Sequence, residues 1–123
     1  MSSNQINWVE IPVNDMERAK NFYAAVFNYE FNDMNMEGIE MAIFPWTPGA
    51  PNASGALVKG NDYQPSQGGV KIYFQCDDLN TELNRVESNG GQIILSKTGL
   101  GDFGHMGLII DTEGNVIGLH SIA

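Results

Sequence analysis

Three residues of this chain, Glu10, Tyr73 and His120, carry side chains suited to proton transfer at positions where they could meet. A carboxylate and an imidazole can act as base and acid near neutral pH, and a phenol can donate a hydrogen bond. Glu10 and Tyr73 each have apolar neighbours on both sides, and His120 alternates with Ile117 and Leu119, which is typical of a half-buried strand. Because successive strand side chains point to opposite faces, we hypothesise that the three converge in one cleft away from the core.

The same alternation places more side chains around this cleft. Trp8 and Lys71 would form its wall, and Trp46, in a loop rich in proline, would cover a ligand or a partner surface. The residues predicted to contact ligand are Trp8, Lys71, Tyr73, Gln75, Gly118 and Trp46, with Glu10 and His120 as the acid–base candidates. Two alternatives remain open: Glu10 and Lys71 could form an ion pair in an unused groove, and Trp8 could be buried at a dimer contact, where aromatic residues are common.

Two other features are given no role in the site. His105 is the second of the two histidines, and the sequence leaves undecided which face of its strand it occupies. Residues 99–104 match the spacing G-x-G-x-x-G, which binds a dinucleotide where a strand turns into a helix. A strand pattern follows here instead, so no helix N-terminus is expected to hold a phosphate, and the glycines predict a flexible connecting loop.

The second half of the chain repeats the pattern of the first at an offset of 63 residues, from Asp15 to Asp78 (78 − 15 = 63). Val9 then aligns with Ile72, and Ile11 with Phe74. Two units are too few for a solenoid, so one domain over residues 1–123 is expected. Its parts are module 1 over 5–59, a connector over 60–69 and module 2 over 70–123.

The apolar spacing gives each module the order βαβββ, and therefore an α+β fold. Strands are expected at 7–13, 29–34, 39–44, 54–58, 70–76, 92–95, 105–110 and 116–121, with helices at 16–27 and 79–89. Asn14 is expected to cap the first helix, with Glu17 returning the contact as in a capping box. The last hairpin would turn through residues 111–115.

Composition excludes several classes of partner. Six basic against fifteen acidic side chains give a net charge of −9, which repels nucleic acid. No apolar run approaches the roughly 18 residues of a membrane helix, and no signal segment is recognisable, so we expect a cytoplasmic protein without membrane contact. The single cysteine, Cys76, is expected to be a buried thiol.

Three segments together resemble the vicinal oxygen chelate superfamily, which includes glyoxalase I, bleomycin resistance proteins and extradiol dioxygenases. They are the strand-to-helix entry at residues 9–15, the Phe22-Tyr23 pair with Phe27-Asn28, and the closing turn at 111–115 followed by Gly118-Leu119. The resemblance covers nearly the whole chain. It implies two βαβββ modules that curve into a half-barrel sheet, a concave site for a small molecule and a homodimer.

The resemblance also implies positions for metal ligands on the first and fourth strands of each module. Carried over to this chain, those positions fall on Trp8, Lys71 and Gly118, and near Gly55 or Leu57. None of these side chains is a usual ligand of a divalent metal. We therefore expect no metal cofactor, since a metal would need donors that the sequence does not identify.

Two functions follow from this resemblance. The first is a metal-independent protein that binds a small molecule, as bleomycin resistance proteins do, in a partly aromatic cleft. The alternative is a lyase or isomerase in which Glu10 or His120 takes a proton next to a carbonyl group. Retained ligand affinity without turnover would distinguish the first from the second.

Overall fold

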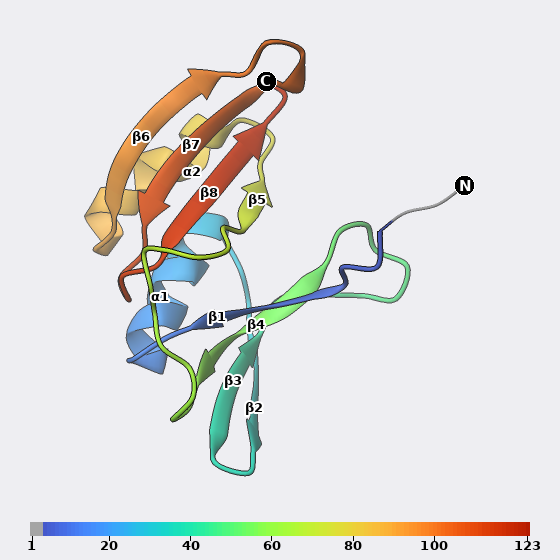
Figure 1. Ribbon diagram of the computed structural model, residues 1–123, viewed down its shortest axis with the longest axis vertical. Coiled ribbons are helices and arrows are strands. Elements are labelled where there is room, and N and C mark those ends of the chain that lie inside the picture. Colours follow the sequence, from blue (N-terminus) through green and yellow to red (C-terminus); the bar gives the residue numbers. More distant parts are fainter. Residues whose placement is uncertain (1–3) are drawn as a thin grey trace.

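The computed structural model describes residues 4–123 and consists of two four-stranded sheets and two α-helices (Figure 1). The first half contains β1 (Trp8–Pro12), α1 (Met16–Phe27), β2 (Asn32–Met36), β3 (Ile39–Ile43) and β4 (Ser54–Lys59). The second contains β5 (Tyr73–Gln75), α2 (Leu79–Val86), η1 (Glu87–Asn89), β6 (Gln92–Gly99), η2 (Gly101–Phe103), β7 (His105–Ile110) and β8 (Val116–Ser121). The predicted α+β fold of two βαβββ modules is confirmed.

Each module folds its strands in the same order. The first sheet runs β1-β4-β3-β2 and the second β5-β8-β7-β6. In each, the first and last strands of the module pair in parallel and the other pairs are antiparallel. Within residues 4–123, neither helix has the length and apolar character needed to cross a membrane.

Both helices pack into one core that the two modules share. Helix α1 buries the face that carries Phe22, Tyr23 and Val26, as its spacing predicts. Rings from the two halves meet there: the centroids of Phe27 and Phe74 lie 4.4 Å apart in a stacked arrangement. The helix-facing sides of both sheets are thus used for the core, and their opposite faces are left for other contacts.

Several predicted boundaries were wrong in detail. Strand β2 begins at Asn32 and not at residue 29, because Tyr29 and Phe31 pack against the ring of Phe44 in the core. Strand β5 spans only Tyr73–Gln75, and β6 continues to Gly99 through an irregular register with β7. Cys76 is buried as expected, and burial raises the pKa of its thiol to about 12.

The predicted cap of the first helix was also wrong. Asp15, and not Asn14, is the N-cap, and its Oδ1 accepts the backbone N–H of Arg18 at 3.0 Å. The N–H groups of Asn14 and Asp15 are instead both donated to Glu113 Oε1, each at 2.8 Å. The side chain that completes this helix start therefore comes from the other module.

Glu113 belongs to the turn 111–115 between β7 and β8, and its side chain is fully buried. Arg18 donates its Nε to Glu113 Oε2 at 2.7 Å and its Nη2 to Oε1 at 3.0 Å. Burial alone would raise the pKa of Glu113, but the Arg18 side chain and the N–H groups of Asp15 and Asn14 outweigh it and hold the pKa at about 2.

Two neighbours of Glu113 in the turn also reach the first module. Tyr23 donates its hydroxyl to Asp111 Oδ2 at 2.7 Å, in the core. Asn115 donates its Nδ2 to the carbonyl of Pro12 at 2.8 Å. We call residues 111–115 the module lock, because their side chains join the end of module 2 to the β1–α1 segment of module 1.

We expect Glu113→Gln to lower the free energy of unfolding by about 2 kcal/mol at pH 7, since hydrogen bonds to a charged group are worth about 1.5–3 kcal/mol. The wild-type advantage should be present above pH 4.5, the ordinary pKa of this carboxyl group, and should disappear as the pH falls towards 2. The sign follows because the unfolded state binds a proton in that window before the folded state does. Urea unfolding of both proteins at pH 7 and pH 3 measures the difference.

Glu30→Gln is the matched control, because Glu30 is exposed and the substitution removes the same charge. It should leave stability within a few tenths of a kcal/mol at either pH. Equal stability of Glu113→Gln and the wild type at pH 7 would mean that the module lock does not depend on this carboxylate.

Candidate functional site

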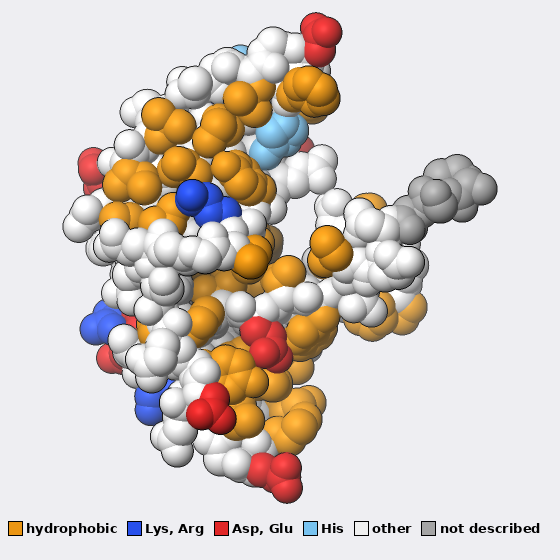
Figure 2. Space-filling view, in the orientation of Figure 1, with side chains coloured by type: hydrophobic (Ala, Val, Ile, Leu, Met, Phe, Trp, Pro, Cys, Tyr) orange, Lys and Arg blue, Asp and Glu red, His pale blue; other side chains and the backbone are white. Residues whose placement is uncertain are grey.

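The two sheet faces turned away from the helices are the surfaces on which a site can form; we call them the outer faces. On the first sheet, pairing in register sets Trp8 beside Ser54 and Glu10 beside Ala56. On the second, Tyr73 lies beside Gly118, which in turn pairs with Leu108. Figure 2 shows hydrophobic side chains gathered over the sheet of β6, β7 and β8, on the side opposite α2.

One hollow on the first outer face lies between two tryptophans. It has a volume of about 410 Å³ and is lined by Asn7, Trp8, Ile43, Trp46, Gly49, Ala50, Asn52 and Ser54. Trp8 is 43% exposed and Trp46 57% exposed, so both indoles offer ring surface to a ligand. This tryptophan hollow is within the usual size range of small-molecule sites, about 300–1,000 Å³.

Glu10 lies next to this hollow and orients one of its walls. Trp8 donates its indole Nε1 to Glu10 Oε2 at 3.2 Å. The negative charge of Glu10 also raises the pKa of the Tyr63 hydroxyl, a residue of the connector. The carboxylate is therefore shared between two aromatic side chains from different segments.

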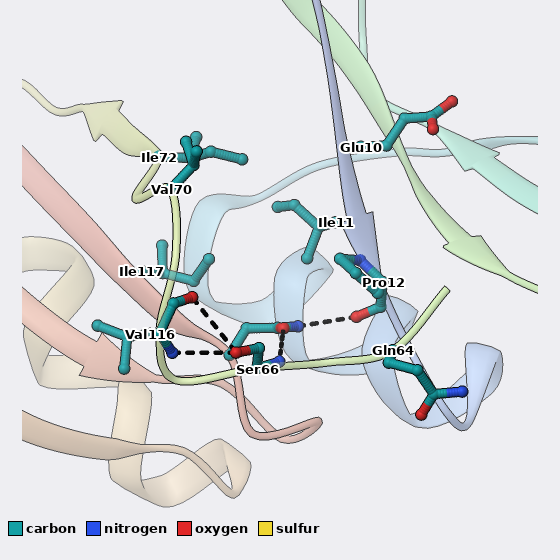
Figure 3. A pocket seen from close by; sticks show the side chains of 11 residues that line it. Glu10, Ile11, Pro12, Gln64, Ser66, Val70, Ile72, Val116 and Ile117 are labelled. Carbon is teal, nitrogen blue, oxygen red and sulfur yellow. Dashed lines mark hydrogen bonds between the residues drawn. The ribbon is translucent and has the colours of Figure 1, made fainter. Parts of the chain in front are cut away.

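Glu10 also borders a smaller pocket of about 150 Å³ where β1, the connector and the start of β8 meet. Figure 3 shows its carboxylate at the rim, directed away from Val116 and Ile117. The connector is held there by Asn115, whose Oδ1 accepts the backbone N–H of Ser66 at 3.0 Å. Of the acidic and basic side chains predicted for the site, only Glu10 borders this pocket.

The remaining predicted residues lie in module 2, most of them on the second outer face. The ring of Tyr73 covers Gly118 so closely that a Cβ on Gly118 would come within 2.4 Å of it. Gln75 pairs with His120 across β5 and β8 and accepts a hydrogen bond from Asn52 Nδ2 at 3.2 Å. His120 places its Nε2 2.6 Å from the carbonyl oxygen of Phe103. Lys71 precedes β5 and is exposed.

Within one chain the predicted residues thus form two groups. Trp8, Glu10 and Trp46 belong to module 1, whereas the other predicted side chains belong to module 2. Asn52 links the groups, because it lines the tryptophan hollow and also a second hollow of about 300 Å³ beside Tyr73 and Gln75. The roles assigned to these residues, including acid–base chemistry by Glu10 and His120, stay predictions.

The structure allows the implied metal positions to be tested for fit. Gly55 and Leu57 pair with Val9 and Ile11 on the core-facing side, so neither can be the outer-face position on β4. That position is Ala56, because it pairs with Glu10 as Gly118 pairs with Tyr73. The position predicted near Gly55 or Leu57 is therefore Ala56, which lies between them.

The corrected set still does not fit a metal. Trp8, Lys71, Ala56 and Gly118 offer no carboxylate, imidazole or thiolate. The ring of Tyr73 fills the space that a side chain on Gly118 would need. Across residues 4–123, no three His, Cys, Asp or Glu side chains are grouped in a way that could hold an ion.

Sequence reasoning missed three residues of this region: Ser54, Asn52 and Tyr63. Ser54 was treated only as the start of a strand, and its place beside Trp8 depends on the β1–β4 register. Asn52 adopts a φ of 71° in its loop, which no local pattern indicates. Tyr63 is the one aromatic residue of the connector, and this was the signal that could have drawn attention to it.

Comparison with known proteins agrees with this architecture. The bleomycin resistance protein-like N-terminal family matches residues 5–45. A glyoxylase-like domain-containing protein of Didymella fabae is 32% identical over 120 residues, which cover 90% of this chain and 88% of that protein. Paired βαβββ modules around one core define the vicinal oxygen chelate superfamily. The chain belongs to the glyoxylase-like family within it.

Two further proteins are similar to this chain, one in sequence and one in structure. The putative glyoxylase CFP32 of Mycobacterium bovis is 28% identical over 127 residues, covering 92% of this chain. The chain spans 44% of that protein, less than half of its length. The crystal structure of TnmS3, an antibiotic binding protein from Streptomyces sp. CB03234, superimposes with a TM-score of 0.74 at 23% identity, over 100% of this chain and 99% of that one.

Proposed function

We propose that this protein binds a flat or extended small molecule in the tryptophan hollow without the help of a metal. The observation that carries the proposal is the pair of exposed indoles, Trp8 and Trp46, in the wall of a 410 Å³ hollow. Large exposed aromatic surfaces in a concavity are costly to leave in water and favourable to cover with a ligand. The Trp8–Glu10 hydrogen bond holds one of these indoles in place before a ligand arrives.

One structural neighbour supports a binding role. TnmS3, which shares the fold over the full length of both chains, is described as an antibiotic binding protein. A hydrophobic wall with few polar groups also suits binding better than acid–base chemistry. Glu10 accepts a hydrogen bond from Trp8, and His120 lies on the other sheet against the carbonyl of Phe103, so the two do not act as an acid–base pair within one chain.

We expect Trp46→Ala to weaken binding of the neutral fluorescent probe N-phenyl-1-naphthylamine by about tenfold, since an aromatic pair is worth about 0.5–1.5 kcal/mol beyond its buried area. Trp46→Phe should recover part of the affinity. Probe fluorescence measured during titration with protein gives the dissociation constants.

The matched control is Phe103→Ala, which removes an aromatic side chain that is 77% exposed but lies outside the hollow. This variant should bind the probe as the wild type does. If Phe103→Ala weakens binding as much as Trp46→Ala, the probe detects exposed aromatic surface in general and the proposal fails.

The second outer face supports a further part of the proposal, a homodimer in which a second copy covers this face. Its side chains Met106, Leu108, Ile110 and Val116 are only partly buried, and Ile94 is 47% exposed. An apolar surface of this kind is typical of an interface between subunits. A ligand in the tryptophan hollow of one chain would then be enclosed by the second sheet of its partner.

We expect Ile94→Glu to shift the protein from dimer to monomer in sedimentation velocity, because a charge would be buried at the subunit contact. Thr81→Glu, at an exposed position of α2 on the other side of this sheet, should leave the dimer intact. A wild-type protein that sediments as a monomer at every concentration would rule the dimer out.

We also expect protein purified without chelator to contain no stoichiometric divalent metal by mass spectrometry. Added Zn²⁺, Ni²⁺ or Mn²⁺ should leave the melting temperature unchanged, because binding that stabilises the fold would raise it. Near-stoichiometric metal that is lost in Glu10→Ala and His120→Ala would overturn this part of the proposal.

A further inference from the structure

Ser54 is a buried polar residue in the wall of the tryptophan hollow. It is 5% exposed, and its Oγ has no hydrogen-bond partner among the described residues. Its backbone N–H is donated to the carbonyl oxygen of Asn7 at 3.3 Å. Buried hydroxyls without a partner are uncommon, and each one calls for an explanation.

The position of Ser54 suggests what its hydroxyl is for. Ser54 begins β4, pairs with Trp8 on the outer face and lines the hollow between Trp8 and Trp46. A hydroxyl that is cut off from water and unpaired lowers the stability of the free protein. A ligand atom that forms the missing hydrogen bond would remove this penalty on binding.

The hydroxyl is sealed from solvent in the free protein, so a ligand must displace part of the wall to reach it. Trp8 is the neighbour that can move, since it is 43% exposed and its indole Nε1 is held by the single 3.2 Å hydrogen bond to Glu10. A small shift of the Trp8 indole, with its ring still in the wall of the hollow, would open the Ser54 hydroxyl to the edge of a bound aromatic ring.

The size of the hollow limits the ligand. An apolar cavity of about 150 Å³ holds one benzene ring. The tryptophan hollow, at about 410 Å³, therefore has room for two or three fused rings. Since a serine hydroxyl can both donate and accept, either a phenolic hydroxyl or a ring carbonyl would satisfy it.

We propose that Ser54 is the specificity-determining residue of the tryptophan hollow and selects fused aromatic ligands that carry a hydroxyl or carbonyl group on the ring edge. This inference rests on the proposed binding function of the hollow. It adds the class of ligand and the side chain that recognises it. Sites built to pair a polar ligand group discriminate strongly against analogues that lack it, because the buried partner is then left unpaired.

Equilibrium dialysis against 2-naphthol and naphthalene tests the proposal, since the two probes differ by one hydroxyl. The wild type should bind 2-naphthol at least tenfold more tightly than naphthalene. In Ser54→Ala the ratio of the affinity for 2-naphthol to the affinity for naphthalene should fall to about that of non-specific apolar binding. The change should come from weaker binding of 2-naphthol alone. Ser96→Ala, at an exposed position on β6, should keep the wild-type ratio.

Thermal unfolding without ligand provides a second readout. Ser54→Ala should melt at the same temperature as the wild type or higher, because the substitution removes an unpaired buried hydroxyl. If Ser54→Ala has a lower affinity ratio and the same or a higher melting temperature, the Ser54 hydroxyl serves ligand recognition and not stability. A clearly lower melting temperature would mean that the Ser54 hydroxyl supports the fold, and the proposal would be wrong.

The outcomes separate this inference from the proposed function. If Ser54→Ala keeps the wild-type preference for 2-naphthol, the role of Ser54 is refuted while the binding function stands. If the wild type binds neither naphthalene nor 2-naphthol, the binding function of the hollow and the role of Ser54 both fail.

Discussion

The buried Glu113 carboxylate is the interaction on which the arrangement of the two modules depends. It accepts the first N–H groups of the α1 segment and pairs with Arg18, although it belongs to the last turn of the chain. A helix start needs acceptors for its free N–H groups, and a buried carboxylate needs donors and a positive charge. Module 2 supplies the carboxylate, and module 1 supplies the N–H donors and the positive charge. This pairing fixes the position of the end of module 2 against module 1.

This constraint determines which surfaces remain for function. Since both helices and the core-facing sides of both sheets are joined in one core, the outer faces are the parts of the sheets left to bind something else. The two faces differ in chemistry. The first carries two tryptophans and a carboxylate, while the second is mainly aliphatic around Tyr73 and His120.

Periodicity and the internal repeat were enough to predict the fold. The alternation of Val9 and Ile11, and of Ile72 and Phe74, reports directly on burial, so strands and faces could be assigned from sequence. The cap by Asp15 and the acceptor role of Glu113 could not be predicted, because Glu113 is 98 residues from Asp15 in sequence and only the fold brings them together. Boundaries such as the start of β2 failed because packing of Tyr29 and Phe31 in the core overrides local propensity.

The site was predictable only in part, for a related reason. Alternation placed Trp8, Glu10 and Tyr73 on the correct faces, but it says nothing about how two sheets are oriented. The structure puts these residues in two groups, and that separation depends on contacts within the shared core. The β4 position could be predicted only as near Gly55 or Leu57, because the two modules differ in spacing: Trp8 is 46 residues from its partner Ser54, and Tyr73 is 45 from Gly118.

The loop before the last strand differs between the two modules in length and in the contacts that it makes. In module 2 this connection is the short turn 111–115, whose side chains hold the two modules together. In module 1 the equivalent connection, residues 44–53, is twice as long and carries Trp46 and Asn52. One set of such side-chain contacts is enough to hold the two modules together. Phe44 packs in the core, but residues 45–53 are exposed, so this part of the loop can change length and composition, and with them the proposed ligand site, without disturbing the fold.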